Sequence, residues 1–409
     1  MTASPADLPP AENARLLRSH IPGRRTGRAT SVRGADVGLG LTGGSPDLLD
    51  VTHFDNTRFP APEWAAECLA AAARDGSLAY TPYRGHPAVL DVLSESVSKL
   101  MGVPVDRPNL LLTPGSQAAL FCTMTALIDE GDLVMVADPD YLFVERMLAF
   151  AGAQVERIPV LAGSESSSLD LDAVDRLLPQ KPKLLVFSNP NNPTGAVYDA
   201  ATLQGIADRA VAGPFRVLVD QLYCRLVYPG VEYQHLAAVE GMADRCITVL
   251  GPSKTESLTG YRIGVLNGPA DVMSAVEQTL TLSALRAPAY AQQLLKRWLV
   301  DDVEFVANRI AELDKLRQLT VSALLEVPGL RLMPGQGTAY VFPDVSALGR
   351  TDEQIAAALQ RQARVVISPG YQFGPRGVGH FRACYARDEG QWSEALALMV
   401  DCLRGFSTS

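Results

Sequence analysis

Residues 183–195 read KLLVFS-NPNNPTG, an apolar run that ends in a turn made of asparagine, proline and glycine. An unbroken apolar run closed by turn residues is typical of a strand buried on both faces of a sheet. Helical stretches separate this run from others like it at Asn109–Thr113, Leu133–Ala137, Phe215–Asp220 and Cys246–Leu250. The pattern predicts an α/β fold with three layers, in which helices cover both faces of a mostly parallel sheet.

Length and charge limit the kinds of protein that this chain can be. It has 409 residues, too many for one ordinary domain, and 47% of them are hydrophobic, which is enough for a sizeable core. The net charge of −9 argues against nucleic acid as a partner, because phosphate binding needs a basic surface. No apolar run approaches the roughly 18 residues of a membrane-spanning helix. We therefore expect neither a nucleic-acid nor a membrane partner.

The N-terminal region and the cysteines bear on the compartment. Residues 1–35 contain several arginines but no continuous apolar stretch, so they do not resemble a secretory signal. The six cysteines are scattered, with no two at C-x-x-C spacing, and the five histidines are equally dispersed. This predicts a cytoplasmic protein with reduced thiols and no metal site.

The texture of the sequence changes after Pro288. A long helical stretch is expected over Ala289–Leu324, and shorter alternating strands and helices follow it. The sequence therefore predicts three parts. These are an N-terminal arm with part of a small domain at 1–48, a large domain at 49–287 and a smaller α/β C-terminal domain at 288–409.

Polar clusters stand directly after four of the apolar runs. The clusters are Gly115-Ser116-Gln117, the asparagine-rich stretch at 189–195, Asp220 and Ser253-Lys254. In an open parallel sheet, ligands bind outside the carboxyl ends of the strands. We therefore expect an anion-binding turn, an asparagine, a carboxylate and an amine on one rim.

The order and spacing of these clusters resemble a known family. NPNNPTG, an aspartate 28 residues after Asn192, and Ser253-Lys254 followed by GYRIG at 260–264 resemble the fold type I pyridoxal-phosphate (PLP) enzymes, specifically the class I/II aminotransferases. The resemblance covers about Gly44 to Arg382. It implies a PLP-binding large domain, a smaller C-terminal domain and the transfer of an amino group from an α-amino acid to a 2-oxo acid.

The resemblance also implies roles around the cofactor ring. Lys254 would form the Schiff base (aldimine) with PLP, through which the cofactor passes to pyridoxamine phosphate, and a lysine must be neutral to do so. Asp220 would pair with the pyridine nitrogen. Burial should raise the pKa of the Asp220 carboxyl unless a nearby cation pairs with it. Asn192 and Tyr223 would donate to the phenolic oxygen, and Tyr141 would stack on the ring.

The phosphate would lie at the start of a helix. Gly115, Ser116 and Gln117 open that helix, so their N–H groups and the helix dipole suit an anion, and Arg262 would pair with it. Many relatives carry a hydroxyl residue three positions before the lysine, where this chain has Gly251. We expect that hydrogen bond to be missing or to come from Ser253.

Two further matches concern the partner subunit and the substrate. Tyr80 resembles the tyrosine that reaches the phosphate of the neighbouring subunit, which implies a homodimer with shared active sites. Arg382 resembles the arginine that binds the substrate α-carboxylate in a bidentate fork, and Gly44 the glycine beside that carboxylate.

The sequence leaves the exact reaction and the donor open. A β-lyase or decarboxylase of the same fold would use the same residues, and a non-catalytic PLP-binding regulator is a further alternative. Arg286 would favour an acidic donor side chain if it enters the pocket, although a place on the surface or at a dimer interface is the plainer expectation. Asp47 and Asp55 would instead favour a basic donor.

Overall fold

The computed structural model describes residues 48–54, 59–75, 78–162 and 167–407. The helices are α3 (Trp64–Arg74), α4 (Pro87–Met101), α5 (Ser116–Leu127), α6 (Val144–Ala151), α7 (Leu171–Leu177), α8 (Ala200–Ala212), α9 (Ala270–Ser283), α10 (Ala289–Gln292), α11 (Val303–Leu324), α12 (Asp352–Ala358) and α13 (Glu389–Ser407). The strands are β1 (Leu49–Asp50), β2 (Leu110–Thr113), β3 (Leu133–Asp138), β4 (Gln154–Ala162), β5 (Ser167–Leu169), β6 (Leu184–Ser188), β7 (Arg216–Asp220), β8 (Cys246–Leu250), β9 (Gly264–Asn267), β10 (Tyr340–Val341), β11 (Val365–Val366), β12 (Ser368–Pro369) and β13 (Phe381–Cys384).

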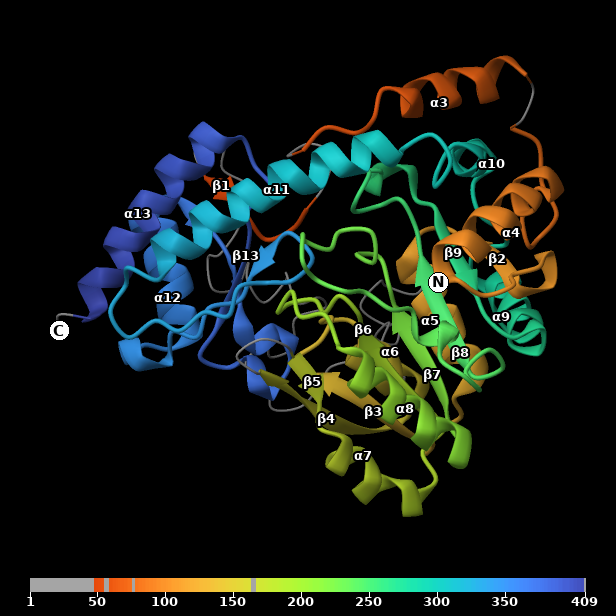
Figure 1. Ribbon diagram of the computed structural model, residues 1–409, viewed down its shortest axis with the longest axis horizontal. Coiled ribbons are helices and arrows are strands. Elements are labelled where there is room, and N and C mark those ends of the chain that lie inside the picture. Colours follow the sequence, from red (N-terminus) through yellow and green to blue (C-terminus); the bar gives the residue numbers. More distant parts are fainter. Residues whose placement is uncertain (1–47, 55–58, 76–77, 163–166, 408–409) are drawn as a thin grey trace, which may run out of the picture.

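The centre of the molecule is an eight-stranded sheet in the order β2-β9-β8-β7-β6-β3-β4-β5 (Figure 1). Neighbours from β8 through β7, β6 and β3 to β4 pair in parallel. β9 runs antiparallel to both β2 and β8, and β5 runs antiparallel to β4. The sheet is therefore mostly parallel, as the apolar runs predict.

Successive strand residues belong to two different cores, which explains why the strands show no polar alternation. Leu110 and Leu112 pack with α4, α7 and α8, whereas Leu111 packs with α5, α6 and α9. Leu185 and Val186 divide in the same way on β6. Because side chains alternate across a strand, both faces are covered and both must be apolar. This confirms the predicted three-layer α/β fold.

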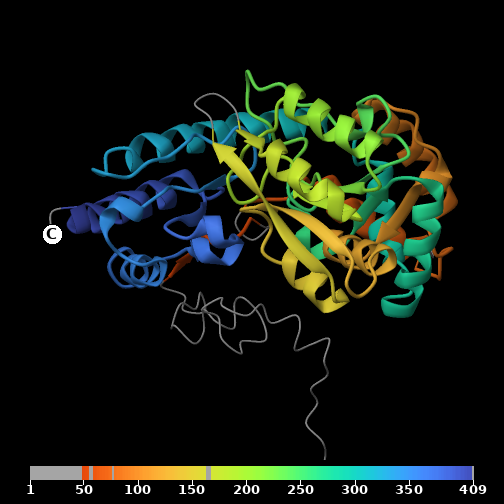
Figure 2. The ribbon, with the colours of Figure 1, turned by 90° about the horizontal axis from the view of Figure 1, so that it is seen from below.

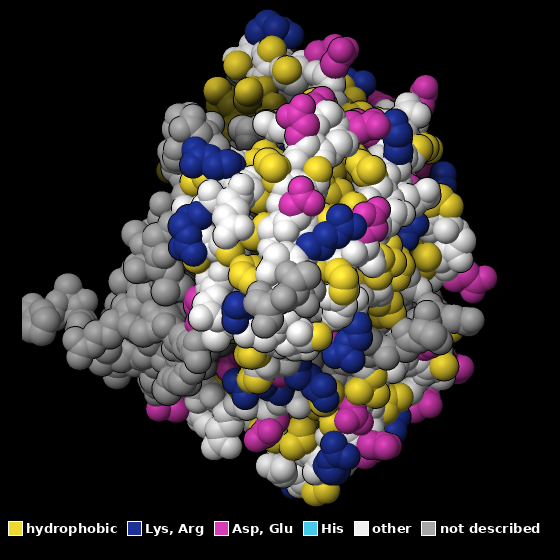
Figure 3. Space-filling view, turned by 90° about the vertical axis from the view of Figure 1, so that its left-hand side faces the viewer, with side chains coloured by type: hydrophobic (Ala, Val, Ile, Leu, Met, Phe, Trp, Pro, Cys, Tyr) yellow, Lys and Arg dark blue, Asp and Glu magenta, His cyan; other side chains and the backbone are white. Residues whose placement is uncertain are grey.

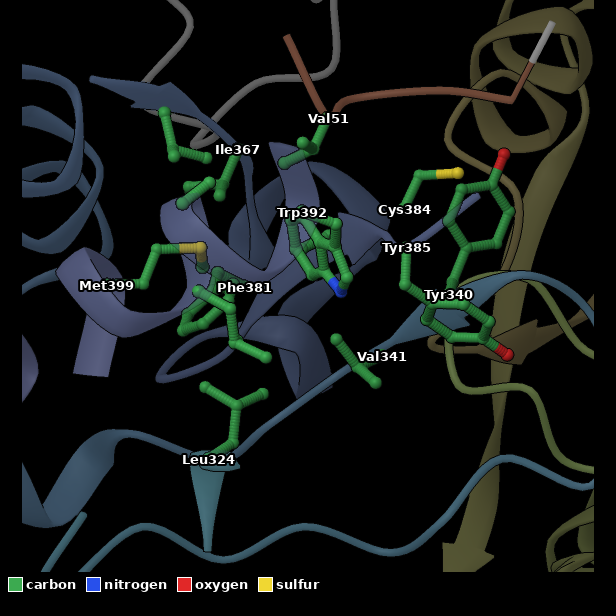
Figure 4. Packing of buried hydrophobic residues seen from close by; sticks show 14 of the residues in the cluster. Val51, Leu324, Tyr340, Val341, Ile367, Phe381, Cys384, Tyr385, Trp392 and Met399 are labelled. Atoms are coloured by element: carbon green, nitrogen blue, oxygen red, sulfur yellow. The ribbon is translucent and has the colours of Figure 1, made fainter. Parts of the chain in front are cut away.

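A second core lies at the C-terminal end of the chain (Figures 1 and 2). There α11, α12 and α13 pack with the three-stranded sheet β10-β13-β12. Trp392 of α13 is fully buried in this core and donates to the Thr320 hydroxyl of α11 at 2.7 Å (Figure 4). Basic and acidic side chains are interspersed on the outer face of this end (Figure 3). Lys315 of α11 and Glu389 of α13 form an ion pair at 2.7 Å.

Two segments have their packing partners at a distance in sequence. β1 pairs in parallel with β11, and Val51 and Phe54 belong to the C-terminal core. Ala291 and Trp298, beyond Pro288, pack with the core on the α4 face of the large sheet. The domain limits at 49 and 288 stay a prediction, and these contacts show which neighbours each segment has.

The prediction of one long helical stretch over Ala289–Leu324 is wrong. α10 ends at Gln292, a 3₁₀ turn covers Gln293–Lys296, and α11 begins only at Val303. Leu299 lies between them in the left-handed region at φ 67°, which interrupts a helix. The Asp302 carboxylate accepts from both terminal nitrogens of Arg225, at 2.7 and 2.8 Å. No helix among the described residues is both long and apolar enough to cross a membrane.

Candidate active site

A cavity of about 410 Å³ lies at the carboxyl ends of the strands, against the C-terminal core. The predicted residues that line it are Ser116, Gln117, Tyr141, Asn192, Asp220, Tyr223, Ser253, Lys254, Arg262 and Arg382. The rim expected from the parallel sheet is therefore present. Arg382 reaches the cavity from β13 of the C-terminal sheet.

One end of the cavity suits an anion. α5 begins at Ser116 directly after β2, so its unpaired N–H groups lie at the cavity wall. A Cβ on Gly115 would lie 2.4 Å from Nη2 of Arg262, so only glycine lets the arginine pack this closely. Arg262 donates through Nη1 to the Thr259 carbonyl at 2.9 Å and has no carboxylate within ion-pair distance among the described residues. A cation and a helix N-terminus thus face the same space.

The middle of the cavity holds an amine and a carboxylate. Nζ of Lys254 donates to the Phe54 carbonyl at 3.2 Å. The Asp220 carboxylate accepts from the Leu222 N–H at 3.2 Å. Burial raises the pKa of the Asp220 carboxyl to about 6, against the lowering effects of that hydrogen bond and of the charge on Lys254. A carboxyl with a raised pKa therefore lies at the end of β7.

Ser253 has no hydrogen-bond partner among the described residues, although its hydroxyl is buried. The residue is 4% exposed, it lines the cavity, and Oγ is unpartnered in the described part of the chain. A buried hydroxyl without a partner is costly unless a ligand supplies one. Ser253 is therefore available for the hydrogen bond that Gly251 lacks.

A buried carboxylate holds the NPNNPTG turn in place. Asp140 accepts from the N–H and the hydroxyl of Ser188, both at 2.9 Å, and from Nδ2 of Asn191 at 3.1 Å. The Ser188 hydroxyl in turn accepts from the Asn192 N–H at 2.9 Å. Burial raises the pKa of Asp140 to about 7. These bonds fix the backbone from which the Asn192 side chain reaches the cavity.

The other end of the cavity holds a guanidinium between two aromatic rings. The guanidinium carbon of Arg382 lies 4.2 Å from the centroid of the Tyr340 ring and 4.6 Å from that of Phe373. Nη1 donates to Oδ1 of Asn192 at 2.6 Å, and Nη2 donates to the Thr52 carbonyl. Nε is buried and unpartnered within the described residues. Arg382 is thus a buried cation at the cavity wall.

Tyrosines complete the wall between these ends. The Tyr141 hydroxyl donates to Oε1 of Gln117 at 2.9 Å, which links it to the first turn of α5. The Tyr223 hydroxyl donates to the Tyr340 hydroxyl at 3.0 Å. Burial raises the pKa of Tyr141 and of Tyr223, so both hydroxyls keep their protons near neutral pH.

Two predicted residues do not line the cavity, and a third lies outside the described residues. Gly115 is adjacent to the cavity behind Ser116 rather than among the lining residues. Tyr80 does not line the cavity of its own chain; it is 84% exposed. Gly44 lies outside the described residues.

Of the residues considered for donor selectivity, the structure describes Arg286 but not Asp47 or Asp55. The Arg286 guanidinium stacks on the rings of Tyr80 and Tyr83, 4.4 and 4.7 Å from their centroids, and donates to the Thr81 carbonyl. Arg286 is absent from the cavity of its own chain. Asp47 and Asp55 lie outside the described residues.

Sequence reasoning missed several residues of the site. Asp140 follows the apolar run of β3, so the rule that selected Asp220 could have found it. Tyr340 and Thr52 gave no such signal. Tyr340 lies in a strand of two residues, and Thr52 contributes a backbone carbonyl, which every residue carries.

The arrangement can hold a substrate with an anion at each end. Arg262 and the start of α5 suit a phosphate, and Arg382 suits a carboxylate. Between them lie an amine that can attack a carbonyl carbon and move a proton, and a carboxyl that a cationic ring nitrogen would ionise.

Comparison with known proteins places this site in a family. Residues 50–398 match the family described as aminotransferase class I and II. The aspartate/prephenate aminotransferase of Thermus thermophilus is 30% identical over 367 residues, which cover 89% of this chain and 90% of that protein. The aromatic-amino-acid aminotransferase 2 of Thermococcus litoralis is 28% identical over 349 residues, covering 85% and 89% respectively.

Solved structures agree with the sequence match. An aspartate aminotransferase from Rhodobacter sphaeroides shares the fold with a TM-score of 0.85 and 31% identity, over 88% of this chain and 92% of that one. A double mutant of the Thermus thermophilus aspartate aminotransferase shares the fold with a TM-score of 0.85 and 28% identity, over 96% of this chain and 99% of that one. The chain therefore belongs to the class I and II aminotransferases and is a pyridoxal-phosphate-dependent transaminase that acts on an amino acid and a 2-oxo acid.

Proposed function

We propose that Lys254 carries the cofactor and that Asp220, Arg262 and Arg382 hold the reacting groups around it. The observation that supports this most directly is that all four side chains line one cavity. An amine, a carboxylate and two separate cations there match the aldehyde, ring nitrogen and phosphate of PLP and the carboxylate of an amino acid.

Features of the cavity that have no partner among the described residues fit PLP. The Ser253 hydroxyl and the first turn of α5 offer donors to a phosphate, and Arg262, which packs closely against Gly115, offers a cation. The raised pKa of Asp220 marks a carboxyl that lacks an adequate cation, and a pyridinium would supply one. The residues present therefore fit the cofactor.

When bound, PLP supplies an electron sink for the carbanion that forms at the substrate Cα. The chain supplies the rest. Nζ of Lys254 would remove the Cα proton and hold it for its return, and the Asp220 carboxylate would keep the ring nitrogen protonated. Because Oδ1 of Asn192 accepts from Arg382, its NH₂ group remains available and would donate to the phenolic oxygen, as the Tyr223 hydroxyl would after turning from Tyr340. The Tyr141 ring, which lines the cavity, would stack on one face of the cofactor ring.

Arg382 would bind the α-carboxylate, the group that every α-amino acid shares. Its fork can pair with a carboxylate through two parallel hydrogen bonds, which fixes the Cα–H bond relative to Lys254. The relatives are named for aspartate, prephenate and aromatic amino acids, and all of these carry that carboxylate.

A half-reaction tests the proposal. The PLP-loaded protein, given one α-amino acid at a time and no 2-oxo acid, is expected to release about one equivalent of 2-oxo acid per subunit and then stop. The release stops because no acceptor restores the cofactor. Aspartate, glutamate, phenylalanine, tyrosine, alanine, arginine and ornithine make a suitable panel. Continuous release of ammonia together with 2-oxo acid would instead indicate a β-lyase, and release of carbon dioxide without 2-oxo acid would indicate a decarboxylase.

The raised pKa of Asp220 predicts a pH dependence of the PLP-free protein. The folded state binds this proton more tightly than the unfolded chain, so the contribution of Asp220 to stability is full below about pH 4 and is lost as the pH rises through about 6. Above that pH the ionised carboxylate should cost about 2–3 kcal/mol. Asp220→Asn removes the ionisation and keeps an acceptor for the Leu222 N–H.

Thermal unfolding of the PLP-free proteins between pH 4 and 8 measures this effect. The midpoint of Asp220→Asn relative to the parent should rise between pH 4 and 6 and then stay level. PLP should stabilise the parent more than Asp220→Asn at pH 8, because only the parent has a carboxylate for the ring nitrogen. A difference between the two proteins that does not change with pH would contradict the assignment.

We further propose a homodimer in which Tyr80 serves the phosphate of the other subunit. Three features support this proposal: the Tyr80 ring is 84% exposed, it lies outside the cavity of its own chain, and Leu282, 90% exposed, adds apolar surface. Sedimentation equilibrium is expected to give twice the subunit mass. Tyr80→Phe is expected to weaken PLP binding by about tenfold to 150-fold, the value of one hydrogen bond to a charged group. A fully active monomer would exclude this arrangement.

We also propose that the protein is cytoplasmic. Its six cysteines are free thiols, which accords with a reducing compartment.

A further inference from the structure

We infer that Tyr340 is a positioning residue for the transamination, because its ring orients Arg382 and its hydroxyl orients that of Tyr223. The inference rests on the roles proposed above for Arg382 and Tyr223. It adds a residue that contacts both the carboxylate-binding end of the cavity and the wall beside the cofactor. Tyr340 is 2% exposed and lines the cavity.

Strand register brings Tyr340 and Arg382 together. β10 and β13 are antiparallel, and Tyr340 lies opposite Cys384. Arg382 is two residues before Cys384 on β13, so it projects from the same face as Tyr340, one diagonal step away. At that spacing an aromatic ring and a long side chain can touch, and the guanidinium carbon lies 4.2 Å from the Tyr340 ring centroid.

The ring limits how the guanidinium can turn. Tyr340 and Phe373 lie 4.2 and 4.6 Å from its central carbon, so the planar group is held between two aromatic rings. Its terminal nitrogens donate to Asn192 and to the Thr52 carbonyl. A guanidinium fixed in this way meets a carboxylate with its fork already oriented, and less rotational freedom is lost on binding.

The Tyr340 hydroxyl contacts a second neighbour, the hydroxyl of Tyr223. The Tyr223 and Tyr340 hydroxyls are 3.0 Å apart, and the rings meet edge to face with centroids 5.9 Å apart. The Tyr223 hydroxyl has one proton. When that proton turns toward an anionic oxygen in the cavity, the Tyr340 hydroxyl can reverse and donate to Tyr223. Two hydroxyls in series then stabilise the anion better than one.

Two substitutions separate these effects. Tyr340→Phe keeps the ring over Arg382 and removes the bond to Tyr223, whereas Tyr340→Leu removes both. Tyr385→Phe is the matched control. Tyr385 is buried in the same core and its hydroxyl bonds another tyrosine hydroxyl, that of Tyr228, but it does not line the cavity (Figure 4).

The first measurement is the pH titration of the visible absorption of each PLP-loaded protein without substrate. Tyr340→Phe is expected to raise the midpoint by about 0.4 to 1 pH unit, because the form without the proton loses part of its stabilisation. Asp220, Lys254 and Tyr141 also face the cofactor and influence the midpoint, but they are the same in every variant. Tyr385→Phe should leave the midpoint at the parental value.

The second measurement is the dissociation constant of maleate and of 3-phenylpropionate, two carboxylates that cannot donate an amino group. Tyr340→Phe should bind them within about twofold of the parent, whereas Tyr340→Leu should bind about fivefold to thirtyfold more weakly, as expected for a lost cation–π contact in a dry site. If Tyr340→Leu does not fold, Tyr340→Met offers a side chain that also lacks a ring.

The outcomes are distinct. An unchanged midpoint in Tyr340→Phe overturns the hydroxyl part of the inference, and unchanged carboxylate affinity in Tyr340→Leu or Tyr340→Met overturns the ring part. An equal midpoint shift in Tyr385→Phe would show a general effect of losing a buried hydroxyl and would also overturn the inference. A parent protein without a visible PLP band would refute the proposed function itself.

Discussion

Lys254→Ala is expected to lower kcat by about four to six orders of magnitude, because one side chain both attacks the cofactor and moves the substrate proton. PLP should still bind without a covalent link, since Arg262, Ser253 and the start of α5 remain. Stopped-flow measurement of 2-oxo acid formation and equilibrium dialysis of PLP report these two properties separately.

Two controls sharpen this result. Lys254→Arg keeps the positive charge but offers no neutral amine at working pH, so it should be as inactive as alanine. Lys315→Ala removes an exposed lysine paired with Glu389 on the surface, and it should transaminate at the parental rate. A Lys254→Ala protein that kept a tenth of the parental kcat would show that another group moves the proton.

Arg382→Lys is expected to lower kcat/KM by about 10²- to 10³-fold, with KM raised and kcat reduced together. An ammonium cannot reproduce the planar fork, and the substitution also leaves the Asn192 amide and the Thr52 carbonyl without their donors. The most specific readout is the preference for an α-amino acid over the amine that lacks its carboxylate. That preference should fall, because the amine never used Arg382.

Arg387→Lys provides a matched control for this prediction. Arg387 is also buried, at 2% exposure, and also donates to backbone carbonyls of the β1 segment, those of Asp50 and His53. It does not line the cavity. Per folded molecule, its kcat/KM should stay within about threefold of the parent, the range of a substitution outside the site. An equal loss in both variants would mean that the segment, rather than the fork of Arg382, sets the rate.

The large sheet and one rim of the site were predictable because both depend on local patterns. Strands covered on two faces need unbroken apolar runs, and this pattern predicts β6. The polar groups follow at the ends of such runs, and this pattern predicts Asp220. β9 was not predicted as a strand. It has four residues, begins with glycine and runs antiparallel between β2 and β8. Its place depends on pairing rather than on pattern.

The C-terminal half of the site could not be derived from local patterns. Arg382 was identified only through the family resemblance, since nothing near it in sequence indicates that it lies opposite Lys254. Tyr340 reaches the cavity through its register with β13, which two short strands do not reveal in advance. The break before α11 coincides with a left-handed residue, Leu299, and with a buried ion pair between Asp302 and Arg225, whose partners are far apart in the chain.

The segment that continues β1 has a consequence for engineering. Within it the Thr52 carbonyl accepts from Arg382, the Phe54 carbonyl accepts from Lys254, and His53 lines the cavity between them. Inserting or deleting one residue there would change substrate affinity and proton transfer at once, since one shift misaligns both carbonyls. Directed evolution of a new donor preference should therefore hold the length of this segment constant and vary the side chain at position 53.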